Sequence, residues 1–157
     1  MKVAVGNISR SEEKFKIGKE LVQEGEFERA ELMLKKAIRL NPKNAEAYFW
    51  LGVTLYNKED YERAIFILTK CIELAPDNYK AYGLRGYNHY ELFELEDAIS
   101  DYTKAIEIEP DDVISYNNRG LVHEKNGEYE LALKIIRRQW NLSRMKLRAI
   151  TIKEIFT

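Results

Sequence analysis

The chain has 157 residues, enough for one compact domain or one short repeat array and too few for two ordinary domains. Lys and Arg number 25 against 26 Asp and Glu, so the net charge of −1 gives no reason to expect a nucleic-acid partner or a membrane surface. Because the chain has one cysteine, no signal-like apolar start and no apolar run of bilayer-spanning length, we expect a cytoplasmic protein without disulfides.

One fixed spacing dominates the sequence. Glycine, alanine and proline each recur at this same step, at Gly18, Gly52, Gly86 and Gly120, at Ala30, Ala64, Ala98 and Ala132, and at Pro42, Pro76 and Pro110. Self-similarity at a fixed period of about 34 residues is the signature of a repeat array. In chain order we predict an N-terminal leader (1–10), three complete units (11–44, 45–78 and 79–112), a degenerate fourth unit (113–141) and a closing segment (142–157).

Each complete unit is predicted to be a hairpin of two short helices. In the unit 45–78, apolar residues recur at steps of three and four in two runs, which is the pattern of two amphipathic helices joined by the polar stretch NKEDY. Asn44, Asn78 and Asp112 stand where their side chains can cap the first helix of the following unit. A proline two residues before each of them cannot continue a helix interior, so it ends the preceding helix.

The repeated glycine and alanine indicate that the two helices of each hairpin cross closely. A glycine inside a helix costs up to about 1 kcal/mol relative to alanine, so four of them at one period imply a compensating close approach. We therefore predict that the periodic glycine of the first helix meets the periodic alanine of the second helix.

The fourth unit departs from this pattern at its end. Gln139 and Trp140 stand where the earlier units have a small residue, and Arg144 stands in place of the proline. The stretch 137–157 holds six basic residues and one acid, a net +5, which leaves −6 for the stretch 1–136. Apolar residues at steps of three and four predict an amphipathic capping helix over 142–157. A β-strand and an altered gene end are the competing interpretations of this segment.

Over roughly residues 11 to 136, the pattern resembles the tetratricopeptide repeat, in which W-x2-L-G-x2-Y, A-x3-F and P recur with a period of about 34 residues. The matching residues are Tyr48, Leu51, Gly52, Leu55, Ala64, Leu68 and Pro76 in the second unit, and Tyr82, Arg85, Gly86, His89, Ala98, Tyr102 and Pro110 in the third. The resemblance implies an all-α fold, a right-handed superhelical stack of antiparallel helix hairpins. It also implies that the first helices line a concave groove that receives peptides or partner segments.

The same resemblance predicts which residues face this groove. They are Phe15, Lys19, Phe49, Trp50, Val53, Tyr56, Asn57, Lys80, Tyr87, Tyr90, Asn117, Leu121 and Lys125. Six of them are aromatic, and aromatic side chains supply large contact area at low entropic cost in binding sites. The alternative for some of these residues, above all Trp50 and Tyr56, is that they fill gaps between neighbouring hairpins.

One kind of ligand is not predicted. Tetratricopeptide domains that hold the acidic C-terminal tails of chaperones use Lys and Asn in one first helix, Asn in the next, and Lys and Arg in the third. The corresponding places in this chain hold Phe15, Lys19, Trp50, Lys80 and Leu84. Only Lys80 agrees clearly, and a frame shifted by one unit matches less well, so chaperone-tail recognition is not expected.

No pattern of catalytic or cofactor-binding residues stands out. His89 and His123 lie one period apart, at the place where the repeat has an aromatic residue, which favours packing between helices over a metal site. Cys71 occupies the small-residue position of the repeat, where we expect a buried, inert thiol. Phosphate-loop, zinc-ligand and serine-elbow motifs are absent from the sequence. We therefore predict neither an enzyme nor a bound cofactor or metal.

Two functions remain open, and both are functions of interaction proteins. In the first, the aromatic groove binds a peptide or a partner protein, as an adaptor or scaffold would. In the second, the array oligomerises with copies of itself through its terminal helices.

Overall fold

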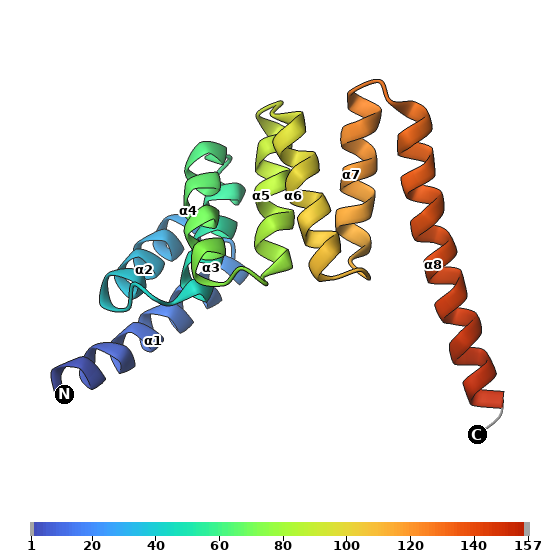
Figure 1. The fold of residues 1–157 in the computed structure, drawn as a ribbon. Coiled ribbons are helices and arrows are strands. Elements are labelled where there is room, and N and C mark those ends of the chain that lie inside the picture. The colour runs from blue at the N-terminus through green and yellow to red at the C-terminus, as the bar shows by residue number, and fades with distance from the viewer. Residues whose placement is uncertain (1, 156–157) are drawn as a thin grey trace.

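The architecture is a single series of α-helices. A computed structural model describes the backbone of residues 2–155 and the side chains of residues 8–142 and Arg144. Within residues 2–155 every regular element is a helix, and none is a strand (Figure 1). The helices are α1 (Lys2–Gln23), α2 (Phe27–Leu40), α3 (Ala45–Asn57), α4 (Tyr61–Leu74), α5 (Tyr79–Glu91), α6 (Leu95–Ile108), α7 (Val113–Lys125) and α8 (Tyr129–Ile155).

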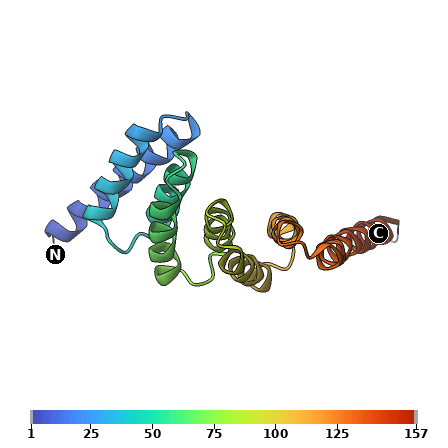
Figure 2. The ribbon, with the colours of Figure 1, turned by 90° about the horizontal axis from the view of Figure 1, so that it is seen from above.

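Consecutive helices form four antiparallel hairpins, α1–α2, α3–α4, α5–α6 and α7–α8. Each hairpin contacts the next through its second helix, and the first helices α1, α3, α5 and α7 also contact one another in order. Seen from above, successive hairpins are rotated relative to their neighbours and the two termini lie at opposite ends (Figure 2). The predicted all-α, right-handed superhelical stack of hairpins is confirmed.

The predicted caps define where the helices begin and end. Asn44 accepts a hydrogen bond from the Ala47 amide at 3.0 Å, and Asn78 accepts one from the Ala81 amide at 3.2 Å. These side chains satisfy amides that have no partner within the first turn of a helix. Helices α2, α4 and α6 each end two residues before a proline, because proline cannot continue a helix interior.

A left-handed residue closes the turn inside every hairpin. Gly25 and Gly127 adopt φ values of 77° and 79°, and Glu59 and Phe93 occupy the same position in the middle hairpins with φ values of 59° and 62°. Residues that have a Cβ rarely adopt this backbone conformation, so the backbone is strained at Glu59 and Phe93. From the sequence, only the Asn126-Gly127 pair suggested such a turn.

The close crossing of the two helices is present. At Gly86 the glycine position faces the periodic alanine through its carbonyl oxygen, and elsewhere its nearest neighbour is a side chain beyond the alanine. A Cβ added at Gly52 would lie 2.6 Å from Leu68 Cδ2, four residues beyond the periodic alanine. At Gly86 it would lie 3.1 Å from Asp101 Cβ and 3.2 Å from the Ala98 carbonyl oxygen. The glycine therefore makes room for the residue about one turn after the alanine. In the first two hairpins this residue is a leucine, Leu34 or Leu68, and it is fully buried.

The C-terminal segment differs from the predicted separate helix. Residues 142–155 continue α8 without a break, and they are helical, so the strand alternative is wrong for these residues. The physical reason is that no proline or glycine follows Gly127, and Arg144 replaces the residue that stopped the earlier second helices. Helix α8 contacts α7 and no other helix of the described backbone, and the side chains of 145–157, which carried the capping prediction, lie outside the described residues.

The N-terminal boundary also differs. Helix α1 begins at Lys2, so most of the predicted leader 1–10 belongs to the first helix of the first hairpin. Helices α1 and α8 are consequently longer than the six helices between them. None of the helices in residues 2–155 combines the length and the apolar character needed to cross a bilayer.

Candidate functional site

An open cavity of about 300 Å³ lies between the first helices α3, α5 and α7. Three of its lining residues are predicted groove residues, namely Tyr56, Lys80 and Tyr87. The others are Tyr79, Gly83, Leu84, Asp112, Ile114, Ser115 and Asn118. Because the wall is mostly apolar and aromatic with a few polar groups, it has the usual make-up of a binding pocket.

A glycine opens this cavity. The position of Gly83 is occupied by Phe15 in the first hairpin and by Phe49 in the second. Both phenylalanines are half-buried and pack against the hydrophobic clusters of their hairpins. At Gly83 the corresponding space is left free, and a Cβ there would meet only Ser115 Oγ, at 3.2 Å.

The Ser115 hydroxyl is the unusual polar group of the cavity. The side chain is 1% exposed, and its Oγ has no hydrogen-bond partner among the described residues. Buried hydroxyls nearly always have a partner, and one without is a site where a ligand or water can bond. Sequence reasoning missed Ser115, although a signal existed, because the earlier units have Ala47 and Ala81 at its position.

Three tyrosines form a continuous aromatic wall beside the cavity. The rings of Tyr56 and Tyr87 meet edge to face with centroids 5.3 Å apart, and the rings of Tyr87 and Tyr90 lie 6.2 Å apart. A hydrogen bond with Glu91, together with burial, raises the pKa of Tyr87 above its ordinary value. Tyr87 and Tyr90 also pack against the buried cluster around Tyr102. They therefore join the groove to the core of the third hairpin.

Lys125 and Phe93 extend this wall toward the turns. The Lys125 ammonium lies 4.1 Å from the Tyr90 ring centroid and 3.9 Å from that of Phe93, both within the range of a cation–π interaction. Phe93 is 69% exposed and is the strained residue of its turn. Sequence reasoning missed Phe93 because its role depends on a backbone conformation that composition does not reveal.

Some of the predicted groove residues of the first two hairpins form a second cluster. The Lys19 ammonium lies 5.1 Å from the Trp50 ring centroid and 6.0 Å from that of Phe15, and it pairs with Glu46 at 3.4 Å. Trp50 is half-buried and packs against the first hydrophobic cluster, as does Val53. Trp50 therefore packs as expected from the alternative interpretation, in which it fills a gap between neighbouring hairpins. Tyr56, by contrast, lines the cavity.

The remaining predicted groove residues lie apart from the cavity. The Asn57 side-chain amide donates to the Val53 carbonyl oxygen at 2.8 Å. Asn117 and Leu121 are exposed on α7 and do not line the cavity. The structure therefore divides the predicted set into the Lys19–Trp50 cluster, the tyrosine wall with the cavity, and isolated surface residues.

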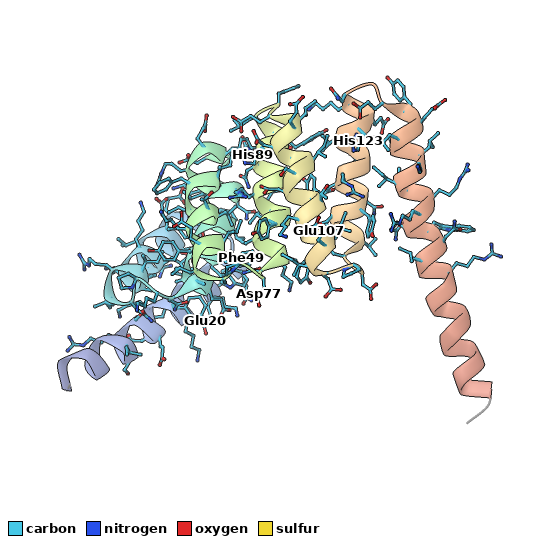
Figure 3. The ribbon with its side chains drawn as sticks, viewed as in Figure 1. Glu20, Phe49, Asp77, His89, Glu107 and His123 are labelled. Carbon is cyan, nitrogen blue, oxygen red and sulfur yellow. The ribbon has the colours of Figure 1, made fainter. Side chains whose placement is uncertain are left out.

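The two histidines close the turns of their hairpins. His89 Nδ1 lies 2.6 Å from Glu94 Oε2, and His123 Nδ1 lies 2.6 Å from Glu128 Oε2. Figure 3 shows both histidines at the turn end of their hairpins. One group of possible metal ligands lies at this turn, with atoms of His89, Glu94 and Asp97 within 4.8 Å of one another. Exposed acidic groups commonly gather without an ion, and His89 already contacts Glu94 directly.

Cys71 has the properties of a structural thiol. It is fully buried, and burial raises its pKa to about 11. A thiol with a raised pKa carries little thiolate at neutral pH, and thiolate is the reactive form. This geometry matches the inert residue expected from the repeat.

Family models match most of the chain. Models described as tetratricopeptide repeat match residues 15–79 and 113–143, and a model described as TPR repeat matches residues 86–127. No curated protein sequence shows significant similarity to the chain.

Several solved structures share the fold. A crystal structure of MamA superposes with a TM-score of 0.85 at 28% identity, covering 94% of this chain and 86% of MamA. MamA from Desulfovibrio magneticus RS-1 gives a TM-score of 0.81 at 23% identity, covering 86% of this chain and 76% of that one. The first TPR of Spaghetti (RPAP3), bound to the HSP90 peptide SRMEEVD, gives 0.75 at 19% identity, covering 76% of this chain and 95% of that one.

The family models and the structural neighbours agree with a stack of helix hairpins at a common period. The fold is that of a protein–protein interaction module. The chain belongs to the tetratricopeptide repeat family.

Proposed function

We propose that the protein is a non-catalytic adaptor or scaffold, acting in the cytoplasm, whose groove binds an extended segment of a partner protein. The observation that carries the proposal is the cavity at Gly83. It is walled by Tyr56 and Tyr87 and also lined by Ser115, whose hydroxyl has no partner among the described residues. A cavity of about 300 Å³ accommodates one or two apolar side chains, and Ser115 offers a hydrogen bond to the bound segment.

The sharpest test fills the cavity instead of removing its walls. Gly83→Phe places the side chain of the first two hairpins into the third, and we expect partner binding to weaken at least about tenfold, or about 1.4 kcal/mol. Proteins captured from native lysate by the unchanged chain and lost with Gly83→Phe are the partners, and their Kd is then measured by calorimetry.

Glu73→Phe is the control for the filled cavity. It adds the same side chain at an exposed position on the second helix α4, outside the cavity, and should leave binding unchanged. If Gly83→Phe folds by circular dichroism and binds the captured partners with the original Kd, the cavity is not the site.

Replacing both Tyr87 and Tyr90 with alanine should weaken partner binding by at least about 2 kcal/mol. Because both tyrosines also pack against the core, the stability of the double variant is measured together with its binding.

A second candidate function is self-assembly through the C-terminal helix. In the first three hairpins the residue equivalent to Ile136 is fully buried, as Leu34, Leu68 and Tyr102, whereas Ile136 is 41% exposed. Trp140, also on α8, is 57% exposed. No further hairpin packs against α8 among the described residues, so this apolar face meets solvent.

Solution mass as a function of concentration tests the self-assembly proposal. If α8 packs against a second copy, light scattering should show a dimer or larger species at micromolar concentration. Trp140→Glu should then return the protein to a monomer, because it places a charge in a buried contact. Leu32→Glu, a change at an exposed leucine on α2, is the control that should leave the mass unchanged. A monomer at all accessible concentrations would reject self-assembly and leave the groove proposal intact.

A further inference from the structure

A second open cavity, of about 320 Å³, lies between α6, α7 and α8 and shares no lining residue with the groove. Its wall is basic, because Arg119, Lys134 and Arg138 line it together with His123. None of the described residues that line it is acidic. Unlike the groove, this cavity involves the second helices α6 and α8, and it lies next to the stretch of chain where the net charge turns positive.

The third hairpin has an arginine at the same position of the repeat, and there the arginine has an acid partner. Arg85 donates from Nε to Asp101 Oδ2 at 2.8 Å and from Nη2 to Asp101 Oδ1 at 2.7 Å, which is a bidentate pair. Its remaining Nη1 donates to Thr69 Oγ1 of the preceding hairpin at 2.9 Å. The pair is largely buried, so each charge satisfies the other away from water.

One period later the same arrangement recurs without its acid. Arg119 Nη1 donates to Thr103 Oγ1 at 3.0 Å, as Arg85 does to Thr69. The position of Asp101, however, is occupied by Ile135, which is buried in the fourth hairpin. The fork of nitrogens that binds a carboxylate in the third hairpin therefore has no acid partner among the described residues of the fourth.

The geometry leaves Arg119 with unused donors in the cavity. Its Nε is buried and has no hydrogen-bond partner among the described residues. Burial lowers the pKa of Arg119, and the neighbouring Arg138 lowers it further. No ion pair joins Arg119, Lys134 or Arg138 to an acid within the part of the chain that the structure describes. A buried charged donor without a partner destabilises the folded protein, and an anion that pairs with the donor removes this penalty. The removed penalty adds to the affinity for the anion.

We propose that the cavity between α6, α7 and α8 binds a carboxylate group, which pairs with Arg119 as Asp101 pairs with Arg85. The Arg119 fork matches the two coplanar oxygens of a carboxylate, and Arg138 and Lys134 supply charge at the rim. The carboxylate is that of an acidic partner segment or of a small free acid. The proposal does not depend on the groove, because the two cavities share no residue.

Nuclear magnetic resonance of the arginine Nε–Hε groups tests the proposal on the whole protein. Sodium acetate and the peptide acetyl-Gly-Glu-Gly-amide are titrated separately, with sodium chloride keeping the ionic strength constant. The Arg119 signal should shift and saturate, and the Arg85 signal should stay in place because its acid is already present. Saturation by the peptide at a concentration at least tenfold lower than acetate identifies a partner segment as the source, and the reverse order identifies a free acid.

Three variants probe the pairing directly. Binding to the variants is measured by calorimetry with the same two ligands, because Arg119→Gln lacks the Nε–Hε group. Arg119→Gln removes the fork and should weaken carboxylate binding at least tenfold, with Arg138→Ala giving a smaller loss. Ile135→Asp restores the missing acid and should likewise abolish binding, because the internal carboxylate occupies the fork. If Ile135→Asp does not fold, Arg119→Gln decides the question.

The proposal is overturned by any of three results. The first is an equal shift of Arg85 and Arg119 with either carboxylate, which would mean nonspecific charge screening. The second is unchanged binding by a folded Arg119→Gln protein. The third is tighter binding of inorganic phosphate than of both carboxylates, which would mean that the cavity selects tetrahedral anions.

Discussion

Replacing Gly86 with leucine is expected to lower the free energy of unfolding by about 3 kcal/mol, the upper end of the usual cost of overpacking. A Cβ at this position already lies 3.1 Å from Asp101 Cβ and 3.2 Å from the Ala98 carbonyl oxygen, and leucine adds three more carbon atoms beyond it. Because one neighbour is backbone, the two helices must separate to admit the side chain. Urea unfolding followed by circular dichroism measures the loss.

A graded series separates packing from helix propensity. Gly86→Ala adds only the Cβ, and its tight contacts offset the gain of up to about 1 kcal/mol from placing alanine in a helix, so the net change should be small. Lys104→Leu adds the same leucine at an exposed site on α6 and should change stability by less than about 0.5 kcal/mol. A Gly86→Leu protein as stable as the original would show that the crossing is not close.

Replacing Glu31 with glutamine is expected to cost about 2–3 kcal/mol of stability at neutral pH. The loss of the buried carboxylate would leave three cations without their shared partner. The Glu31 carboxylate is 9% exposed and accepts hydrogen bonds at 2.6 Å from Lys35, Lys58 and Arg63. Lys58 and Arg63 belong to the second hairpin, so this acid links α2 to the next unit. Burial alone would raise the pKa of Glu31, but the three cations outweigh it and lower the pKa to about 2.

This effect has a definite dependence on pH. The pKa of Glu31 is depressed in the folded state, so its contribution is fully present above the unfolded value of 4.5 and is lost as the pH falls toward about 2. At about 1.4 kcal/mol per pKa unit, the difference corresponds to an upper limit of about 3 kcal/mol. The stability of the original and Glu31→Gln proteins should therefore converge between about pH 4.5 and pH 2.

Glu28→Gln is the matched control for this prediction. Glu28 lies on the same helix, is exposed, and approaches Lys58 only to 3.8 Å. Such surface pairs contribute about 0–1 kcal/mol, so the control should lose little stability at any pH. A Glu31→Gln protein that behaves like Glu28→Gln between pH 4.5 and pH 7 would contradict the role of the buried carboxylate.

The repeat architecture was predictable because its signals are local. Helix amphipathicity depends on residues three and four apart, caps depend on residues such as Asn44 and Asn78 beside a helix start, and proline acts on its own helix. The same locality explains a failure at the C-terminus. The sequence has Arg144 in place of the proline and predicts a new helix from residue 142. An uninterrupted helix, however, needs only the absence of a stop signal.

The site could be predicted only in part. Family resemblance identified the first helices as the groove wall and placed Tyr56, Lys80 and Tyr87 on it, where they line the cavity. It could not reveal that Tyr87 and Tyr90 also pack on the core, or that Phe93 reaches Lys125. These features depend on contacts between helices and on an unusual φ angle, and neither is encoded in the spacing of one helix.

The sequence by itself determined the all-α fold, the order of the hairpins and the repeat period, because these follow from helix periodicity, capping and proline within short stretches. Only the tertiary structure decided that Gly83 leaves a cavity, that Ser115 beneath it has no partner among the described residues, and that Arg119 lacks the acid that Arg85 has. Each of these depends on side chains from different helices that meet where the helices pack together. These contacts between helices depend on how the hairpins stack, and the local sequence around one residue does not specify the stacking.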